Sequence, residues 1–101
     1  MLKRPTRITT HPGEILREEY LKPLKLSANA LAAELHVPAN RVSAIVNGTR
    51  GVTADTAMRL GRYFNTTAEF WLNLQTVHDL TKAQMEAGKE IDRRVRPRAA
   101  A

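Results

Sequence analysis

The side chains best suited to chemistry in this sequence lie close together, at Asn40, Arg41, Ser43 and Asn47. All of them can donate hydrogen bonds, and no acidic residue lies among them. Paired hydrogen bonds from Asn to adenine or from Arg to guanine each contribute on the order of 1 to 3 kcal/mol of base discrimination. We therefore expect Asn40 to read adenine and Arg41 to read guanine. A phosphate contact is the alternative role for Arg41.

Two short helices and a tight turn are expected to position this set. Ser27 is a good N-cap for the first helix. Its apolar residues recur at helical spacing, at Leu31, Ala32 and Leu35. The pattern stops at His36-Val37-Pro38, because Pro38 disfavours a helical residue before it and can itself start a new helix. The second helix repeats the spacing, at Val42, Ile45 and Val46. This is the helix-turn-helix layout, whose second helix lies in the DNA major groove.

A plain corner between two helices is the alternative to a DNA-binding unit. Ala32 is small and sits where the two helices must cross closely, while Val42 and Ile45 fill the inner angle. The residues left outside are Asn40, Arg41, Ser43, Ala44 and Asn47. An ordinary corner would put larger or charged residues at some of these positions, so the pattern favours DNA binding.

Length and composition exclude several classes of protein. With 101 residues, 43% of them hydrophobic, the chain is long enough for one helical core but not for two. No apolar run approaches a membrane span and the N-terminus lacks the apolar core of a signal peptide, which predicts a cytoplasmic protein. Because cysteine is absent, disulfides and thiol catalysis are excluded, and a zinc site is not expected.

An enzyme is the interpretation with the least support. The sequence has no paired Ser/His/Asp set, no phosphate-binding glycine loop and no metal-ligand spacing. The histidines fall on three separate predicted elements, at His11, His36 and His78. We expect no cofactor, no metal and no small-molecule substrate.

The net charge of +6 is unevenly distributed. Residues 1–7 carry three basic side chains and no acid, and residues 82–101 carry six basic and three acidic ones. Between them, residues 36–66 contain one acid, Asp55, against four arginines, which are Arg41, Arg50, Arg59 and Arg62. A domain with one positive flank and two positive tails is suited to binding the phosphate backbone of a nucleic acid. For residues 93–98, a basic tail that is merely solvated is an equal alternative.

The rest of the chain predicts an all-α fold of five helices. His11 caps the first helix, Pro12 stands at its first position and Glu14 at its third, which explains this motif without metal or catalysis. Pro23 is expected to close that helix near Lys22. Residues 1–10 are predicted to be a flexible basic arm.

Two further helices are expected after the helix-turn-helix. Thr53 caps a helix from Ala54 to about Phe64, and Asn65 follows as a left-handed C-cap. A capping box from Thr66 to Glu69 opens the fifth helix, which should reach Asp79 or Leu80 and complete a DNA-binding and dimerisation domain of residues 11–80. Residues 81–101 are then a basic extension, helical in part but interrupted by Gly88, with disorder over residues 97–101.

The fifth helix has apolar residues on more than one face. The residues expected to pack inward are Phe70, Trp71, Leu74 and Val77, and those left partly outward are Leu72, Gln75 and His78. A second apolar face in so small a domain indicates a partner, and we expect a symmetric dimer contact there. A single exposed leucine in a monomer is the alternative.

Four segments together resemble the HigA-type antitoxins, a branch of the XRE, or phage-repressor-like, helix-turn-helix proteins. They are HPGEILREEYLKPL, SANALAAELHV, NRVSAIVNGTRGVTADTAMRLGRYF and EFWLNLQTVHDL, and they cover about residues 11–80. The HPGE opening combined with FWLNLQ is specific within the wider class. Three positions where the family often has glycine hold Lys25, His36 and Asn65, each just past a helix end.

The resemblance implies a homodimeric antitoxin that represses its own operon by binding an inverted-repeat operator and neutralises a RelE-like, HigB-type, mRNA-cleaving toxin. Its DNA-binding residues would be Ser27, Ala28, Asn29, Pro38, Ala39, Asn40, Arg41, Ser43, Asn47 and Arg50. From the residues of the fifth helix, we place the dimer contact at Trp71, Leu72, Gln75 and His78. The acidic face of the first helix, which carries Glu14, Glu18 and Glu19 together with Arg17, could meet a basic toxin, although a solvated helix face is the alternative. A stand-alone repressor without a toxin would share every DNA-reading residue, and a pure toxin-binding module is a further alternative.

Overall fold

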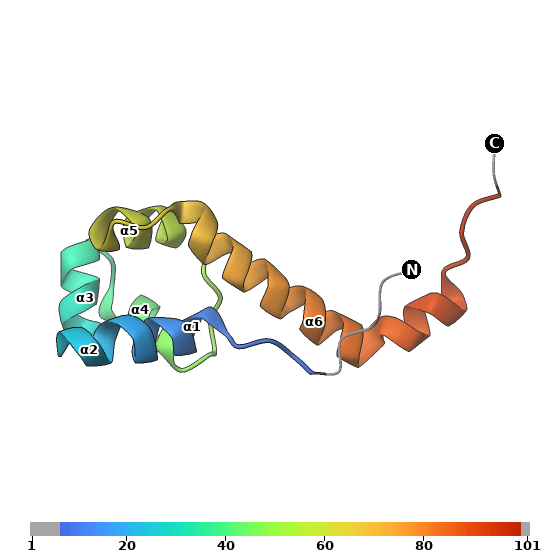
Figure 1. Ribbon diagram of the computed structural model, residues 1–101, viewed down its shortest axis with the longest axis horizontal. Coiled ribbons are helices and arrows are strands. Elements are labelled where there is room, and N and C mark those ends of the chain that lie inside the picture. The colour runs from blue at the N-terminus through green and yellow to red at the C-terminus, as the bar shows by residue number, and fades with distance from the viewer. Residues whose placement is uncertain (1–6, 100–101) are drawn as a thin grey trace.

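Every regular element in residues 7–99, the part of the chain described by a computed structural model, is a helix. The elements are α1 (Pro12–Ile15), the π-helical turn η1 (Leu16–Leu21), α2 (Lys22–Leu24), α3 (Ala28–Leu35), α4 (Ala39–Val46), α5 (Ala54–Phe64) and α6 (Ala68–Arg94). The backbone stays right-handed helical at both ends of η1, so α1, η1 and α2 form one rod. The five-helix, all-α fold expected from the sequence is confirmed, and Figure 1 shows its arrangement.

The sequence predicted that Pro23 would end the first rod near Lys22. That prediction is wrong, since the rod continues through Leu24. A proline has no N–H to donate, and its ring conflicts with the carbonyl four residues earlier in an α-helix. The turn before Pro23 is wider than an α-helical turn, with the N–H of Lys22 bonded to the carbonyl of Arg17, five residues back. The wider turn accommodates Pro23, and the rod ends where Lys25 becomes left-handed.

The helix ends follow the predicted capping closely. A side chain accepts a backbone N–H at the start of α1, α3 and α5, and the capping residues are His11, Ser27 and Thr53. Three residues just past helix ends have φ angles of 53°, 58° and 57°, and they are Lys25, His36 and Asn65. The left-handed C-cap predicted at Asn65 is confirmed, and Lys25 and His36 end their helices in the same conformation.

Trp71 lies at the centre of the core, with 0% of its surface exposed. Its indole N–H donates to Thr66 Oγ1 at 2.9 Å. That bond uses the hydroxyl expected to cap α6, and Thr67 caps the helix instead by accepting the N–H of Phe70 at 3.0 Å. The predicted capping box from Thr66 to Glu69 is therefore wrong by one residue. Trp71 was also expected in a dimer contact, but it is covered within the protomer and belongs to the core.

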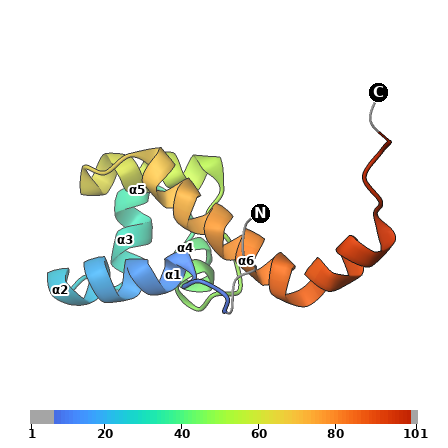
Figure 2. The same ribbon diagram turned by 45° about the vertical axis from the view of Figure 1, so that its right-hand side comes forward.

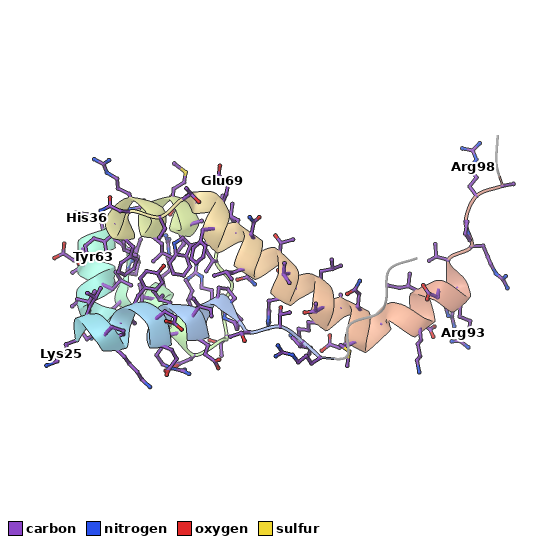
Figure 3. The ribbon with its side chains drawn as sticks, in the orientation of Figure 1. Lys25, His36, Tyr63, Glu69, Arg93 and Arg98 are labelled. Carbon is purple, nitrogen blue, oxygen red and sulfur yellow. The ribbon has the colours of Figure 1, made fainter. Side chains whose placement is uncertain are left out.

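The core joins the first rod, α3, α4, α5 and the start of α6. Among the described residues, its other fully buried large side chains are Pro12, Leu16, Leu31, Val42, Ile45 and Leu60. Figure 3 shows side chains crowded between the rod and α5, whereas those along the second half of α6 point into solvent on several sides. The apolar spacing used to predict α3, α4 and α5 thus identifies the faces that meet.

α6 is a single helix of 27 residues and is longer than predicted. We expected it to end at Asp79 or Leu80 and expected Gly88 to interrupt any continuation, but these positions lie inside the helix. A glycine costs a helix only about 1 kcal/mol relative to alanine, so the good helix formers around Gly88 carry the helix past it. The domain limit expected between residues 80 and 81 therefore falls within α6. Figures 1 and 2 show the second half of α6 leaving the body and changing direction.

Residues 7–10 precede the first rod and contact α6. The N–H of Thr9 donates to Thr81 Oγ1 at 3.0 Å, and the carbonyl of Thr9 lies 2.7 Å from Nδ1 of His78. The last part of the arm expected to be flexible is therefore held against α6, while residues 1–6 lie outside the described residues. At the other end, residues 95–99 form no regular element and residues 100–101 lie outside. Over residues 7–99, no helix combines the length and hydropathy needed to cross a membrane.

Candidate nucleic-acid interface

α3 and α4 form the predicted helix-turn-helix, with three residues between them. Ala32 is 1% exposed where the helices cross, and Val42 and Ile45 are each 1% exposed inside the angle. The rod holds α4 from the opposite side, since Gly13 approaches Ile45 so closely that a Cβ at residue 13 would lie 1.7 Å from the Ile45 carbonyl oxygen. α4 is therefore seated against both α3 and α1, with its other side open.

The residues expected to bind DNA fall into two groups by exposure. Those that are exposed are Ser27, Asn29, Pro38, Ala39, Asn40, Asn47 and Arg50. Those that are half-buried are Ala28, Arg41 and Ser43. All of them lie on α3, on α4 or on the segments that flank these two helices.

The outer face of α4 carries amide and hydroxyl groups. Successive residues of an α-helix are rotated by about 100°, so Asn40, Ser43 and Asn47 share the side opposite the buried Val42 and Ile45. Ser43 Oγ donates to the carbonyl of Asn40 at 3.3 Å. The amides of Asn40 and Asn47 thus lie on an exposed strip with the hydrogen-bonding groups that base edges require.

Arg41 lies beside this strip rather than on it, and an acid from α5 holds it there. Its Nη1 is 3.0 Å from Asp55 Oδ2, and Arg59 Nε is 2.8 Å from the same oxygen. Arg59 also donates through Nη1 to the carbonyl of Leu35 at 2.8 Å, at the end of α3. The hydrogen bond from Arg59, together with the charges of Arg59 and Arg41, lowers the pKa of Asp55 despite an opposing desolvation effect. One carboxylate therefore ties α3, α4 and α5 together.

Sequence reasoning did not assign a role to Asp55 or Arg59. The available signal was that Asp55 is the one acid among four arginines in residues 36–66. That composition indicates an ion pair but does not identify its partner, because Arg41 and Asp55 are 14 residues apart. Only the folded structure, which brings the Asp55 carboxylate within 3.0 Å of Arg41 Nη1, identifies the partner.

The loop after α4 is tied at both ends. Ala44 O accepts the N–H groups of Thr49 at 2.9 Å and Arg50 at 3.2 Å, which satisfies a carbonyl at the end of α4. Further on, the N–H of Val52 donates to Gln75 Oε1 at 2.7 Å. Gln75 was expected in a dimer contact, but its amide oxygen fixes this loop and its Nε2 donates to Asp79 at 2.8 Å. The placement of Arg50 thus depends on α6 as well as on α4.

The start of α3 lies close to basic residues that the sequence analysis left without a role. Ser27 and Ala28 border a hollow that also contacts Val46 of α4. Lys22 and Lys25 line the same hollow, and Lys22 Nζ lies 2.8 Å from Glu18. The helix start expected to contact phosphate therefore has positive charge beside it, which favours an anion.

The side of α6 expected to form a dimer is mostly occupied by the protomer itself. Leu72 is half-buried against the core, and His78 contacts Thr9 and the ring of His11, whose centroid is 4.9 Å away. Phe70 and Val77 were expected to pack inward, but they are 38% and 48% exposed. They line a groove of about 410 Å³ between α6 and the segment before α1. This groove is therefore one exposed apolar surface of α6 that a partner can reach.

The residues expected to meet a toxin form a charge network on the first rod. Arg17 Nε is 2.9 Å from Glu18 and its Nη2 is 3.8 Å from Glu14. Glu18 also pairs with Lys22, and the hydrogen bonds from Lys22 and Arg17 lower its pKa. Each of the two acids thus has a basic neighbour within the rod, and the pairing is closer for Glu18 than for Glu14. Over residues 7–99, no group of three or more His, Asp or Glu side chains is placed to hold a metal ion.

Comparison with known proteins gives consistent matches. The helix-turn-helix family model matches residues 18–71. Virulence-associated protein I of Dichelobacter nodosus is 60% identical over 76 residues, which cover 75% of this chain and 70% of that protein. The Pseudomonas aeruginosa antitoxin HigA, solved with the higBA promoter, is 48% identical with a TM-score of 0.86 over 90% of this chain and 98% of that one. The antitoxin GraA, solved in complex with its operator, is 47% identical with a TM-score of 0.91 over 99% of this chain and 100% of that one.

Proposed function

The chain belongs to the helix-turn-helix family, in the branch of the HigA-type antitoxins, and from that membership we propose that it is an antitoxin that binds operator DNA and represses its own operon. The observation that carries the proposal is the polar strip on the outer side of α4, made of the exposed Asn40, the half-buried Ser43 and the exposed Asn47 at the end of the helix. Related antitoxins with this fold have been solved on promoter or operator DNA.

α4 is assigned to the major groove, where its polar strip faces the bases. Asn40 is the strongest candidate for a base contact, because an exposed Asn amide matches the donor and acceptor that adenine presents there. Asn29 and the start of α3 are assigned to phosphate, as is Arg50 on the loop after α4. Such contacts hold the protein in register without reading sequence.

A homodimer is part of the proposal, because two copies are needed to read an inverted repeat. Phe70, Val77 and Ile91 are 38%, 48% and 51% exposed and fall at multiples of seven residues along α6. Residues seven apart are offset by only about 20° around a helix, so these three form an apolar stripe about 60° wide, which Gln84 interrupts between Val77 and Ile91. We place the dimer contact on this stripe. Two α4 helices about 34 Å apart would then read successive turns of one duplex.

Neutralisation of a RelE-like toxin is the second part of the proposal, and it rests on membership of the family. The network of Glu14, Arg17 and Glu18 remains the candidate contact, although its charges are mostly paired within the rod. Both activities would place the protein in the cytoplasm. The alternative is a stand-alone repressor, which would keep the α4 strip and have no toxin partner.

Binding of the wild-type protein to a duplex from upstream of its own gene tests the DNA-binding function. We expect tighter binding to that duplex than to a scrambled duplex, a footprint of two half-sites, and a steep loss of affinity with salt as phosphate contacts release counterions. Equal binding to both duplexes would contradict the proposal. Sedimentation at micromolar concentration, with a dimer expected, tests the α6 contact.

Co-expression with the adjacent open reading frame separates the antitoxin from the stand-alone repressor. An antitoxin should co-purify with the neighbouring product and restore growth of cells that express it. A neighbour that is harmless when expressed alone and does not co-purify would favour the stand-alone repressor, with DNA binding unaffected.

A further inference from the structure

Two arginines share one carboxylate oxygen at the edge of the α4 strip. Arg41 Nη1 and Arg59 Nε lie 3.0 Å and 2.8 Å from Asp55 Oδ2. Arg59 is anchored a second time, through its bond to the Leu35 carbonyl at the end of α3. Asp55, whose side chain is 59% exposed, is therefore paired with Arg59 on its own helix and offers the same carboxylate oxygen to Arg41 on α4.

Arg41 is constrained in a way that the neighbouring polar residues are not. Its side chain is 25% exposed, and its Nε is buried without a hydrogen-bond partner. Helical geometry places it about 100° round α4 from Asn40, on the flank that faces α5. An arginine here is long enough to reach toward a phosphate if nothing holds it, because its guanidinium stays charged and carries five donors.

We propose that Asp55 is a positioning residue that keeps Arg41 on the flank of α4 in the DNA-bound protein, so that Arg41 adds no phosphate contact. This inference rests on the proposed DNA binding, and it replaces the guanine contact that the sequence led us to expect for Arg41. Recognition of the DNA bases is then carried out by the exposed amides of Asn40 and Asn47. Asp55 limits the part of the affinity that does not depend on sequence.

A double-mutant cycle over residues 41 and 55 tests the proposal. The four proteins are wild type, Arg41→Ala, Asp55→Asn and the double variant, and each is titrated with operator and scrambled duplexes at several salt concentrations. Asp55→Asn should bind scrambled DNA about fivefold to tenfold more tightly at 0.1 M salt and steepen the salt slope by about 0.9, because one phosphate contact is gained. In the Arg41→Ala background the same substitution should change neither quantity beyond about twofold, because the freed guanidinium is missing.

Three results would overturn the proposal. One is an equal gain from Asp55→Asn with and without Arg41, which would mean that the acid acts only through its own charge. Another is no gain in either background. The last is a shallower salt slope for Arg41→Ala alone, which would mean that Arg41 already holds a phosphate; this variant answers the question even if Asp55→Asn fails to fold. Failure of the proposed function is distinct, because wild type would then not prefer the operator.

Discussion

The helices packed around Trp71 bury their large apolar side chains. The second half of α6, by contrast, leaves its apolar side chains about half exposed. In the packed body, Trp71 and Leu31 are 0% exposed. In the extension, Met85 and Ile91 are 48% and 51% exposed although they belong to an uninterrupted helix. The body therefore holds the α4 strip in place with its own core. The extension has helix-forming residues but no core, and of these two side chains only Ile91 belongs to the stripe proposed as the dimer contact.

Removing Trp71 should produce the largest loss of stability, because it takes away the centre of the packed body. Trp71→Ala deletes a fully buried indole and leaves Thr66 without its donor, so we expect the free energy of unfolding to fall by about 3 to 5 kcal/mol. Met85→Ala is the matched truncation on the extension, away from the proposed dimer stripe, and should cost less than about 0.5 kcal/mol. Urea unfolding of both variants measures the difference. Similar losses would mean that the extension contributes to the same core.

The close approach of α1 to α4 gives the next largest effect. Gly13→Ala would place a Cβ 1.7 Å from the Ile45 carbonyl oxygen, and two backbones cannot yield as a flexible side chain can. We expect a loss of about 3 kcal/mol, at the upper end for overpacking, together with weaker operator binding because α4 is displaced.

Gly48→Ala is a control for Gly13→Ala that tests backbone strain alone. Gly48 has φ of 79° and nothing within 4 Å of an added Cβ, so the cost should be about 1 to 2 kcal/mol. Thermal melts and operator titrations of both variants measure the two contributions. A smaller loss of stability for Gly13→Ala than for Gly48→Ala would contradict the close contact between α1 and α4.

Acidification should have the smallest effect on the free energy of unfolding. The effect arises where α1 meets α6, at His11. Burial lowers the pKa of His11 below its usual 6.5, as does the charge of His78, and Nδ1 of His11 accepts the Gly13 N–H at 2.8 Å. The unfolded chain therefore binds the proton more readily than the folded one. Stability from His11 is complete above about pH 6.5 and is lost as the pH falls from there toward the lowered pKa.

A stability profile between pH 7.5 and 5.5 measures this loss. His11→Asn keeps a good capping residue but cannot titrate, so its profile should be flatter than that of wild type. Glu18 and Asp55 have lowered pKa values and titrate below this range, so they do not interfere. Parallel profiles for the two proteins would contradict the role of His11.

The features predicted correctly from the sequence are those encoded by neighbouring residues. α3 and α5 have the expected bounds, because Ser27 and Thr53 cap them and His36 and Asn65 end them within a few residues of the apolar pattern. The buried side of α4 follows for the same reason, since helical spacing alone identifies the inward residues.

The features that were missed depend on contacts between distant segments or on competition between local signals. Asp55 reaches Arg41 across 14 residues, and Gln75 reaches Val52 across 23, so neither pairing is visible in a window of sequence. Pro23 and Gly88 each predicted the end of a helix from the sequence. A π-helical turn accommodates Pro23, and the strong helix formers on both sides of Gly88 keep α6 helical through it. The DNA-binding role of α4 therefore stays a prediction, and the pairing of Arg41 with Asp55 could be found only in the folded structure.

The measurement that tests the central claim most directly is the ratio of affinities for operator and scrambled duplexes in Asn40→Ala, with Asn29→Ala as the matched control. The account predicts that Asn40→Ala reduces the ratio about tenfold or more by weakening operator binding alone, since it removes a base contact. Asn29→Ala should weaken binding to both duplexes equally, because a phosphate contact carries no sequence information. An unchanged ratio in Asn40→Ala would show that the polar strip of α4 does not read DNA.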